Sequence, residues 1–185
     1  MGRAKFIKGF SLVELLIVIS IFVVLLFLSA PLFFPENIKF DSWANSLYNA
    51  LYRAKISAIV NLYNTGFIVL DNRNYMIFLD LNRNNNFDNN IDTVILNTRN
   101  IINDFNNRNS FIQSINISSN NLDTTIINFN PNNVIFRFNS LGFVNLPNNN
   151  NFNFIDFNLV NNRVRYRYVI RLIPGGDINI RKIMN

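Results

Sequence analysis

The chain has 185 residues, a formal net charge of +6 at pH 7, and neither cysteine nor histidine. The lack of both residue types excludes disulfides and Cys–His or Ser–His nucleophilic catalysis, and it disfavours a zinc site. No glycine-rich stretch has the spacing that cradles phosphate. The sequence therefore predicts neither an enzyme nor a bound cofactor, with calcium as the one alternative considered below.

A basic leader and a long apolar run open the chain. Residues 1–9 contain three basic side chains and end in Gly9. Residues 10–34 are apolar apart from three serines and Glu14. As a helix, these 25 residues would extend roughly 37 Å, which exceeds the ~30 Å hydrocarbon core of a bilayer. The basic leader predicts a cytoplasmic N-terminus, with the rest of the chain across the membrane.

The order of these two segments separates two kinds of export signal. A secretory signal peptide has a shorter apolar region, and its small-residue cleavage site follows that region. Here the small residue Gly9 comes before the apolar run, so a cut there would leave the helix on the mature chain. A carboxylate such as Glu14 is costly in lipid, which predicts a functional role and a cationic partner.

The segment Gly-Phe-Ser-Leu-Val-Glu-Leu-Leu-Ile-Val-Ile, residues 9–19, resembles the type IV prepilin signature. The resemblance implies cleavage after Gly9 by prepilin peptidase, N-methylation of the new N-terminal Phe10, and assembly through Glu14. The Glu14 carboxylate would pair with the Phe10 amine of a neighbouring subunit. Two buried charges offset each other's desolvation only when they are paired, so the pair would favour helices in one axial register.

A second, amphipathic helical segment is predicted over residues 35–65. Pro31 matches the position at which many type IV pilins bend their helix, and Pro35 would end the membrane part. After it, apolar side chains recur at spacings of three and four from Phe40 to Leu62, the pattern of a helix that packs one face against a sheet. Gly66 is expected to end this helix in a left-handed cap.

Short runs of Val, Ile and Phe that alternate with polar residues predict antiparallel strands over residues 66–185. The expected strands lie at residues 66–70, 75–80, 111–117, 124–129, 134–138, 143–146 and 152–159. Residues 53–59, the Asn-rich loop after Asp80 and residues 136–143 resemble the GspH/FimT group of minor pilins and pseudopilins. The expected fold class is α+β, a pilin-like fold with a long N-terminal membrane helix followed by an antiparallel β-sheet domain.

The loop after residue 80 has oxygen side chains with the alternation of a calcium loop, at Asp80, Asn82, Asn84, Asp88 and Asp92. It departs from an EF-hand loop, because Asn85 stands where the invariant Gly is expected and Ile91 stands in place of the final Glu. Asn and Asp also form turns by bonding their own backbone. A calcium site and a metal-free turn are therefore alternatives.

Basic residues gather near the C-terminus. Residues 157–185 contain six basic side chains and one acidic side chain. Alternation along one strand would place four of them on one face, and a returning strand would add the other two; the set is Arg163, Arg165, Arg167, Arg171, Arg181 and Lys182. Some FimT-like proteins bind DNA through basic residues at this end. Instead of DNA, the basic residues could bind an acidic protein or an anionic surface. They could also be a solvated face of an edge strand, where charges prevent pairing with another chain.

The resemblance implies a minor pilin or pseudopilin that assembles into or primes a type IV pilus-like fibre for type II protein secretion or related export. The alternative is a DNA-binding minor pilin for DNA uptake. The implied partners are other pilins, prepilin peptidase and an inner-membrane assembly platform. The chain would cross the bacterial inner membrane once, with residues 35–185 outside the cytoplasm.

Overall fold

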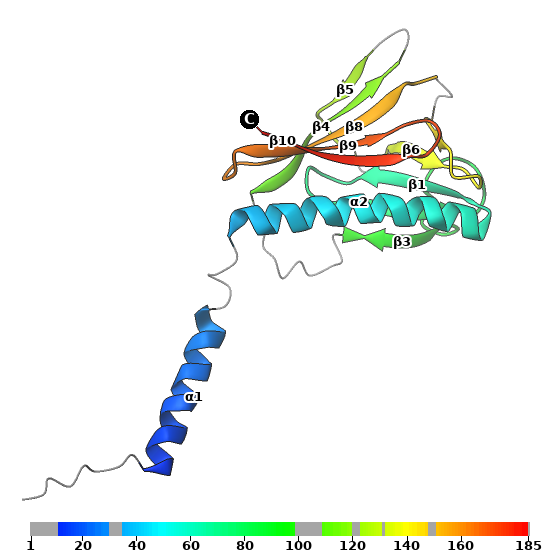
Figure 1. Ribbon diagram of the computed structural model, residues 1–185. Helices are drawn as coiled ribbons and strands as arrows, with labels where there is room; N and C mark the ends of the chain where they lie inside the picture. The colour runs from blue at the N-terminus through cyan, green and yellow to red at the C-terminus, as the bar shows by residue number, and fades with distance from the viewer. Residues whose placement is uncertain are drawn as a thin grey trace, which may run out of the picture. The chain divides into compact units, whose positions relative to one another are not determined.

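The computed structural model describes residues 11–29, 35–98, 109–119, 123–130, 132–147 and 151–184, without the side chains of residues 27–29. The chain divides into two compact units, Met1–Pro35 and Glu36–Asn185. In the described residues, the first unit contains α1 (Leu12–Ser29), and the second contains α2 (Glu36–Asn61) and all the strands (Figure 1). Gly9, Phe10 and Pro31, for which roles were predicted, lie outside the described residues.

Helix α1 is apolar on all sides. Its large apolar side chains from Leu12 to Leu26 are each at least 43% exposed. A helix without a polar face needs an apolar surrounding on every side. Across the described ranges, no helix is both long and apolar enough to cross a membrane, so the membrane-spanning helix over residues 10–34 stays a prediction.

Helix α2 begins at Glu36, directly after Pro35, as the sequence predicted. Its buried face repeats at spacings of three and four and contains four alanines, which let the helix lie close to the sheets; the buried residues are Phe40, Ala44, Leu47, Ala50, Leu51, Ala54 and Ala58. The acidic first turn also suits the positive end of the helix dipole.

The predicted end of α2 at Gly66 is wrong. The helix ends at Asn61, and the left-handed residue is Leu62, with φ of 58°. Gly66 lies in strand β1 opposite Phe78, and an added Cβ there would overlap the Phe78 ring. Glycine is needed at this position because an aromatic ring lies against the backbone, and not because the chain turns.

Ten strands in the described residues form two antiparallel sheets of five. The first sheet has the order β3-β2-β1-β6-β7, formed by Thr93–Asn97, Tyr75–Asp80, Asn64–Val69, Val134–Phe138 and Val144–Asn145. The second has the order β10-β9-β8-β4-β5, formed by Ile178–Met184, Tyr166–Leu172, Phe154–Asn161, Ser110–Ser118 and Thr124–Ile126. The predicted α+β class, with a helix before antiparallel sheets, is confirmed.

The main core lies where α2 and both sheets meet. Phe67 of β1 stacks on Phe136 of β6 with ring centroids 5.2 Å apart, and Phe157 of β8 meets Phe67 edge-on at 5.6 Å. All three rings are buried with the inner face of α2. Each fully buried ring stabilises the fold by about 1.5–3 kcal/mol relative to an exposed one.

A smaller core covers the opposite face of the first sheet. Ile68, Met76 and Phe78 point away from α2 and pack with Phe87, from the loop after β2. The Phe78 and Phe87 rings meet edge-on with centroids 5.0 Å apart. The loop of residues 81–92, a candidate for calcium binding, is thus fixed over the sheet by a half-buried aromatic residue.

Candidate functional site

The first turn of α1 contains Glu14, the only charged residue of that helix. Glu14 Oε2 accepts a hydrogen bond from the Ser11 backbone N–H at 2.9 Å, and Ser11 Oγ accepts one from the Val13 N–H at 3.3 Å. This is capping-box geometry, in which two otherwise unpaired donors of the helix start are satisfied. The Ser-x-x-Glu spacing is the sequence signal for this cap, and the prepilin resemblance did not reveal it.

The remaining described part of α1 has little polar chemistry. The Ser20 hydroxyl donates to the Leu16 carbonyl of the same helix, so it does not need a partner outside the helix. Glu14 therefore stands alone as a charge at one end of an apolar surface. A carboxylate can accept several hydrogen bonds, so Glu14 can cap its own helix and still accept from a cation outside the subunit.

Comparison with known proteins agrees with this arrangement. The model of the prokaryotic N-terminal methylation motif matches residues 5–30. Over 83 residues the chain is 36% identical to the pilin-like protein PilA1 of Thermus thermophilus, a stretch that covers 44% of this chain and 53% of that protein. The chain thus matches about half the length of this relative. No solved structure matches.

The chain is thus similar to type IV pilin-like proteins, in its N-terminal motif and over about half the length of a pilin-like relative. Its helix followed by antiparallel sheets is consistent with the pilin-like fold that the sequence predicted. The cleavage after Gly9, the methylation of Phe10 and the pairing of Glu14 with a neighbouring subunit stay predictions.

In the second unit, the loop of residues 80–92 is organised by its own side chains. Asp80 accepts the backbone N–H groups of Asn84 and Asn85 at 3.2 and 3.0 Å. Asp92 accepts those of Leu81 and Asp88 at 2.9 and 2.7 Å. The side chains of Asn82, Asn84 and Asp88 each accept an N–H two residues further on.

These bonds favour the metal-free turn over the calcium site. Every predicted oxygen ligand already accepts a backbone N–H, and no group of three or more Asp, Glu, His or Cys residues suited to a metal gathers in the described ranges. Asn85 stands where a calcium loop has its invariant glycine. It has φ of 70°, the left-handed conformation that glycine adopts at that position. Calcium binding stays an untested prediction.

Arg137 supplies a positive charge beside this loop that sequence reasoning missed. Asp80 is 0% exposed and Arg137 is 4% exposed. Burial raises the pKa of the Asp80 carboxyl, opposed by hydrogen bonds from the Asn85 and Asn84 backbone. Burial lowers the pKa of Arg137, opposed by the charge of Asp80. Arg137 Nη1 has no hydrogen-bond partner in the described part of the chain. The charge of Asp80 therefore favours the charged form of the buried Arg137.

The predicted arginine strip is only partly on one strand. Strand β9 begins at Tyr166, so Arg163 and Arg165 lie in the turn before it, and their expected place on the strand face is wrong. The core side of β9 has four buried residues at alternate positions, namely Tyr166, Tyr168, Ile170 and Leu172, while Val164, which alternation also assigns to this side, lies in the turn before the strand. Arg167 and Arg171 occupy the opposite face.

Several of the basic residues are paired within the domain. Arg171 forms a bidentate bond with Asp156 of β8, with Nε–Oδ1 and Nη2–Oδ2 distances of 2.7 and 2.6 Å. This bond raises the pKa of Arg171, and the guanidinium also lies over the Phe154 ring at 3.8 Å. Arg163 Nη1 lies 3.7 Å from Glu36 Oε1. Lys182 Nζ lies 3.6 Å from Asp41 Oδ2 and 3.6 Å from the centre of the Tyr166 ring.

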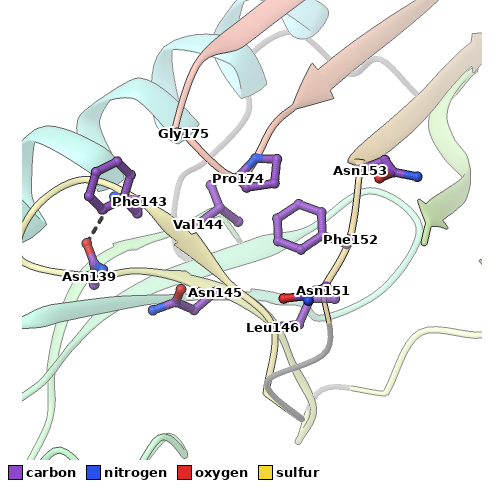
Figure 2. Close-up of a pocket in the computed structure, with 10 residues that line it drawn as sticks. All are labelled: Asn139, Phe143, Val144, Asn145, Leu146, Asn151, Phe152, Asn153, Pro174 and Gly175. Carbon is purple, nitrogen blue, oxygen red and sulfur yellow. Dashed lines mark hydrogen bonds between the residues drawn. The ribbon is translucent and has the colours of Figure 1, made fainter. Parts of the chain in front are cut away.

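A cavity of about 700 Å³ opens beside β7. Figure 2 shows its lining residues, which come from the β6–β7 hairpin, the segment before β8 and the β9–β10 turn: Asn139, Phe143, Val144, Asn145, Leu146, Asn151, Phe152, Asn153, Pro174 and Gly175. Asn139 Oδ1 is occupied by the N–H groups of Leu141 and Phe143. These lining side chains are neutral and offer no acid, base or nucleophile.

Proposed function

We propose that this pilin-like chain is a minor pilin or pseudopilin of the GspH/FimT group. It would be cut after Gly9, methylated at Phe10, and would assemble into or prime a type IV pilus-like fibre for type II protein secretion or related export. The supporting observation is that α1 is apolar on every side and that its single carboxylate, Glu14, lies in its first turn within the matched methylation motif.

The exposed surface of α1 supports a membrane-anchored subunit. Thirteen large apolar side chains from Leu12 to Leu26 are exposed. Covering a large apolar side chain fully is worth about 1.5–3 kcal/mol, so an apolar surrounding favours this helix by on the order of 10 kcal/mol or more. The lipid of an inner membrane would supply that surrounding before assembly, and the equivalent helices of neighbouring subunits would supply it in a fibre.

The position of Glu14 supports assembly in a fixed register. An unpaired carboxylate inside an apolar bundle is costly, while one that meets a cation is much less so. The N-terminal amine of a cleaved neighbour is a cation close to the same level of the helix. Axial displacement of one helix would separate the two charges, so the aligned arrangement is preferred.

The intact mass of protein purified from membranes tests the processing step. The expected mass is that of the chain beginning at Phe10 plus one methyl group. A mature N-terminus after Ala30 would instead indicate an ordinary signal peptide and would contradict the proposal. Loss of a secreted enzyme from the culture medium on deletion of the gene would favour the secretion role over a pilus without one.

The alternative is a DNA-binding minor pilin for DNA uptake. It is favoured by Arg165 and Arg181, which are exposed and have no carboxylate partner in the described part of the chain, with Arg167 half-buried on the outer face. Titration with duplex DNA at several salt concentrations tests it. Three phosphate contacts would give a log–log slope of about −2.7, and replacing Arg165 and Arg167 by Gln would flatten the slope by about two. No binding near physiological salt would exclude this alternative.

A further inference from the structure

The turn between β8 and β9 is fixed to the start of α2. We call residues 162–165 (Asn162, Arg163, Val164 and Arg165) the basic turn. Arg163 Nη1 lies 3.7 Å from Oε1 of Glu36, the first residue of α2. Just after the turn, the Tyr166 hydroxyl donates to Asp41 Oδ1 at 2.6 Å and lies 3.2 Å from the Asn37 carbonyl oxygen.

Helix α2 follows the apolar run almost directly in the chain. Only Pro35 separates Glu36 from Phe34, the last residue of that run. Two residues of fully extended chain span at most about 7 Å, whatever direction α2 takes. The polar layer on each side of a bilayer is roughly 5–8 Å thick. If the apolar run is embedded, this short link keeps Glu36, and the Arg163 side chain paired with it, within reach of the lipid headgroups.

The charges at this end of the domain are mostly positive. Glu36 lies near Lys39 and Arg163, and Asp41 lies near Lys182. A further cation, Arg165, follows Arg163 in the basic turn. Arg165 is exposed and has no carboxylate partner among the residues that the structure describes, and the Arg163 side chain is 65% exposed. Val164 packs against the core, which keeps both arginines at the surface.

We propose that the basic turn binds the phosphate groups of anionic lipids and docks the β domain on the membrane from which its helix emerges. This inference rests on the membrane anchorage proposed above. Arginine binds phosphate oxygens through two parallel N–H groups. The headgroups are favoured over DNA because the tether holds them at high effective concentration beside the turn, whereas DNA must arrive from solution.

The test uses the full chain in lipid nanodiscs made either of neutral phosphatidylcholine or of a mixture with anionic phosphatidylglycerol. The chain has no cysteine, so Asn162→Cys gives a single site for a nitroxide label in the basic turn. Gly175→Cys is the matched control site, because a side chain there meets nothing within 4 Å and the residue lies in the β9–β10 turn. Relaxation of the nitroxide by nickel chelated to lipid headgroups reports its distance from the membrane surface.

We expect strong relaxation of the Asn162 label in anionic discs, weaker relaxation in neutral discs, and little at Gly175 in either. Arg163→Gln combined with Arg165→Gln should lower the ratio of docked to undocked domain about 30-fold, or about five-fold for each charge removed. Arg163→Lys with Arg165→Lys keeps the charge and should retain most of the docking. Arg53→Gln with Arg83→Gln removes two exposed arginines outside the basic turn and should change little.

Each contrary result has its own meaning. Equal relaxation in neutral and anionic discs, or no effect of the double Gln variant, would overturn the lipid contact while leaving the anchorage intact. Failure of the wild-type chain to co-purify with the discs would overturn the anchorage and this inference together. A label that stays remote from the headgroups, with duplex DNA binding lost in the same double variant, would assign the turn to nucleic acid.

Discussion

Helices α1 and α2 follow one another in the chain but gain their stability in different ways. α1 has 18 residues, and its described side chains are all exposed. α2 has 26 residues and buries seven of them on one face against the sheets. In proteins, most of the stability of a helix comes from the packing of its apolar face and not from helical propensity. α2 packs against the sheets of its own domain, whereas the apolar surface of α1 must be covered by lipid or by other subunits.

The largest effect is expected from removing the one charge of α1. Glu14→Ala should abolish incorporation into fibres, because the neighbour's N-terminal amine loses its partner. Glu14→Gln is the informative control, since Gln can still accept the Ser11 N–H of the capping box but has no charge. Co-purification with other pilin subunits is the measurement. If Glu14→Gln assembles normally, the cap and not the charge is what assembly requires.

The second-largest effect is expected from a core substitution, which should distinguish the role of α2 from that of α1. Phe40→Ala on α2 should lower the free energy of unfolding of the domain by about 3–5 kcal/mol, because Phe40 is fully buried. Leu16→Ala on α1 should leave it unchanged, since the Leu16 side chain is exposed. Denaturant unfolding of both variants in detergent, followed by near-ultraviolet circular dichroism, measures the difference. A similar loss in both would mean that α1 also stabilises the domain.

Alkaline pH should weaken the attachment of α2 to the second sheet. Burial and a hydrogen bond to Asp41 raise the pKa of Tyr168 to about 12, and the same causes raise the pKa of Tyr166. An unfolded tyrosine ionises near pH 10, so stability is intact below that value and falls as pH rises to about 12. Tyr168→Phe should make this decline of the unfolding free energy shallower. An unchanged pH profile would contradict the assignment.

The smallest effect is expected from calcium. If the unit of residues 36–185 needs no metal for its stability, millimolar calcium should leave its melting temperature unchanged. The reason is that each candidate ligand in loop 80–92 already accepts a backbone N–H. A ligand that binds only the native state would raise the melting temperature by mass action. A rise in melting temperature with calcium that disappears in Asp80→Asn would support the calcium site. It would also show that the domain, like α1, is stabilised by a partner from outside the chain.

Local patterns predicted local structure well. The three- and four-residue spacing from Phe40 onward predicted α2, and alternation predicted the strand segments that became β1, β2, β4, β6 and β8. Predicted strand limits were too long where polar residues interrupt pairing, as in β5, which ends at Ile126. The motif around Glu14 was recognised because its residues are contiguous.

What the sequence did not reveal depends on distant partners. The bond between Arg171 and Asp156 exists because β8 and β9 pair in one register, and a shift by one residue would separate the two side chains. The ring of Phe78 over Gly66 is likewise a cross-strand event, so Gly66 was taken for a cap. β9 begins only at Tyr166 because a turn follows β8. The residues around Arg163 and Arg165 contain no sequence pattern that predicted this turn.

The contacts of Asp41 have a consequence for when the domain can fold. Its carboxylate accepts hydrogen bonds from Tyr166 and Tyr168, which lie 125 and 127 residues further along the chain, and it pairs with Lys182. Contacts of such separation make folding slow, because a long loop must close first. During synthesis the N-terminal part emerges first. The Asp41 carboxylate on α2 therefore has none of these partners until β9 and β10 have been synthesised. A ribosome that stalls before β9 would leave Phe40 without the tyrosines that pack on it.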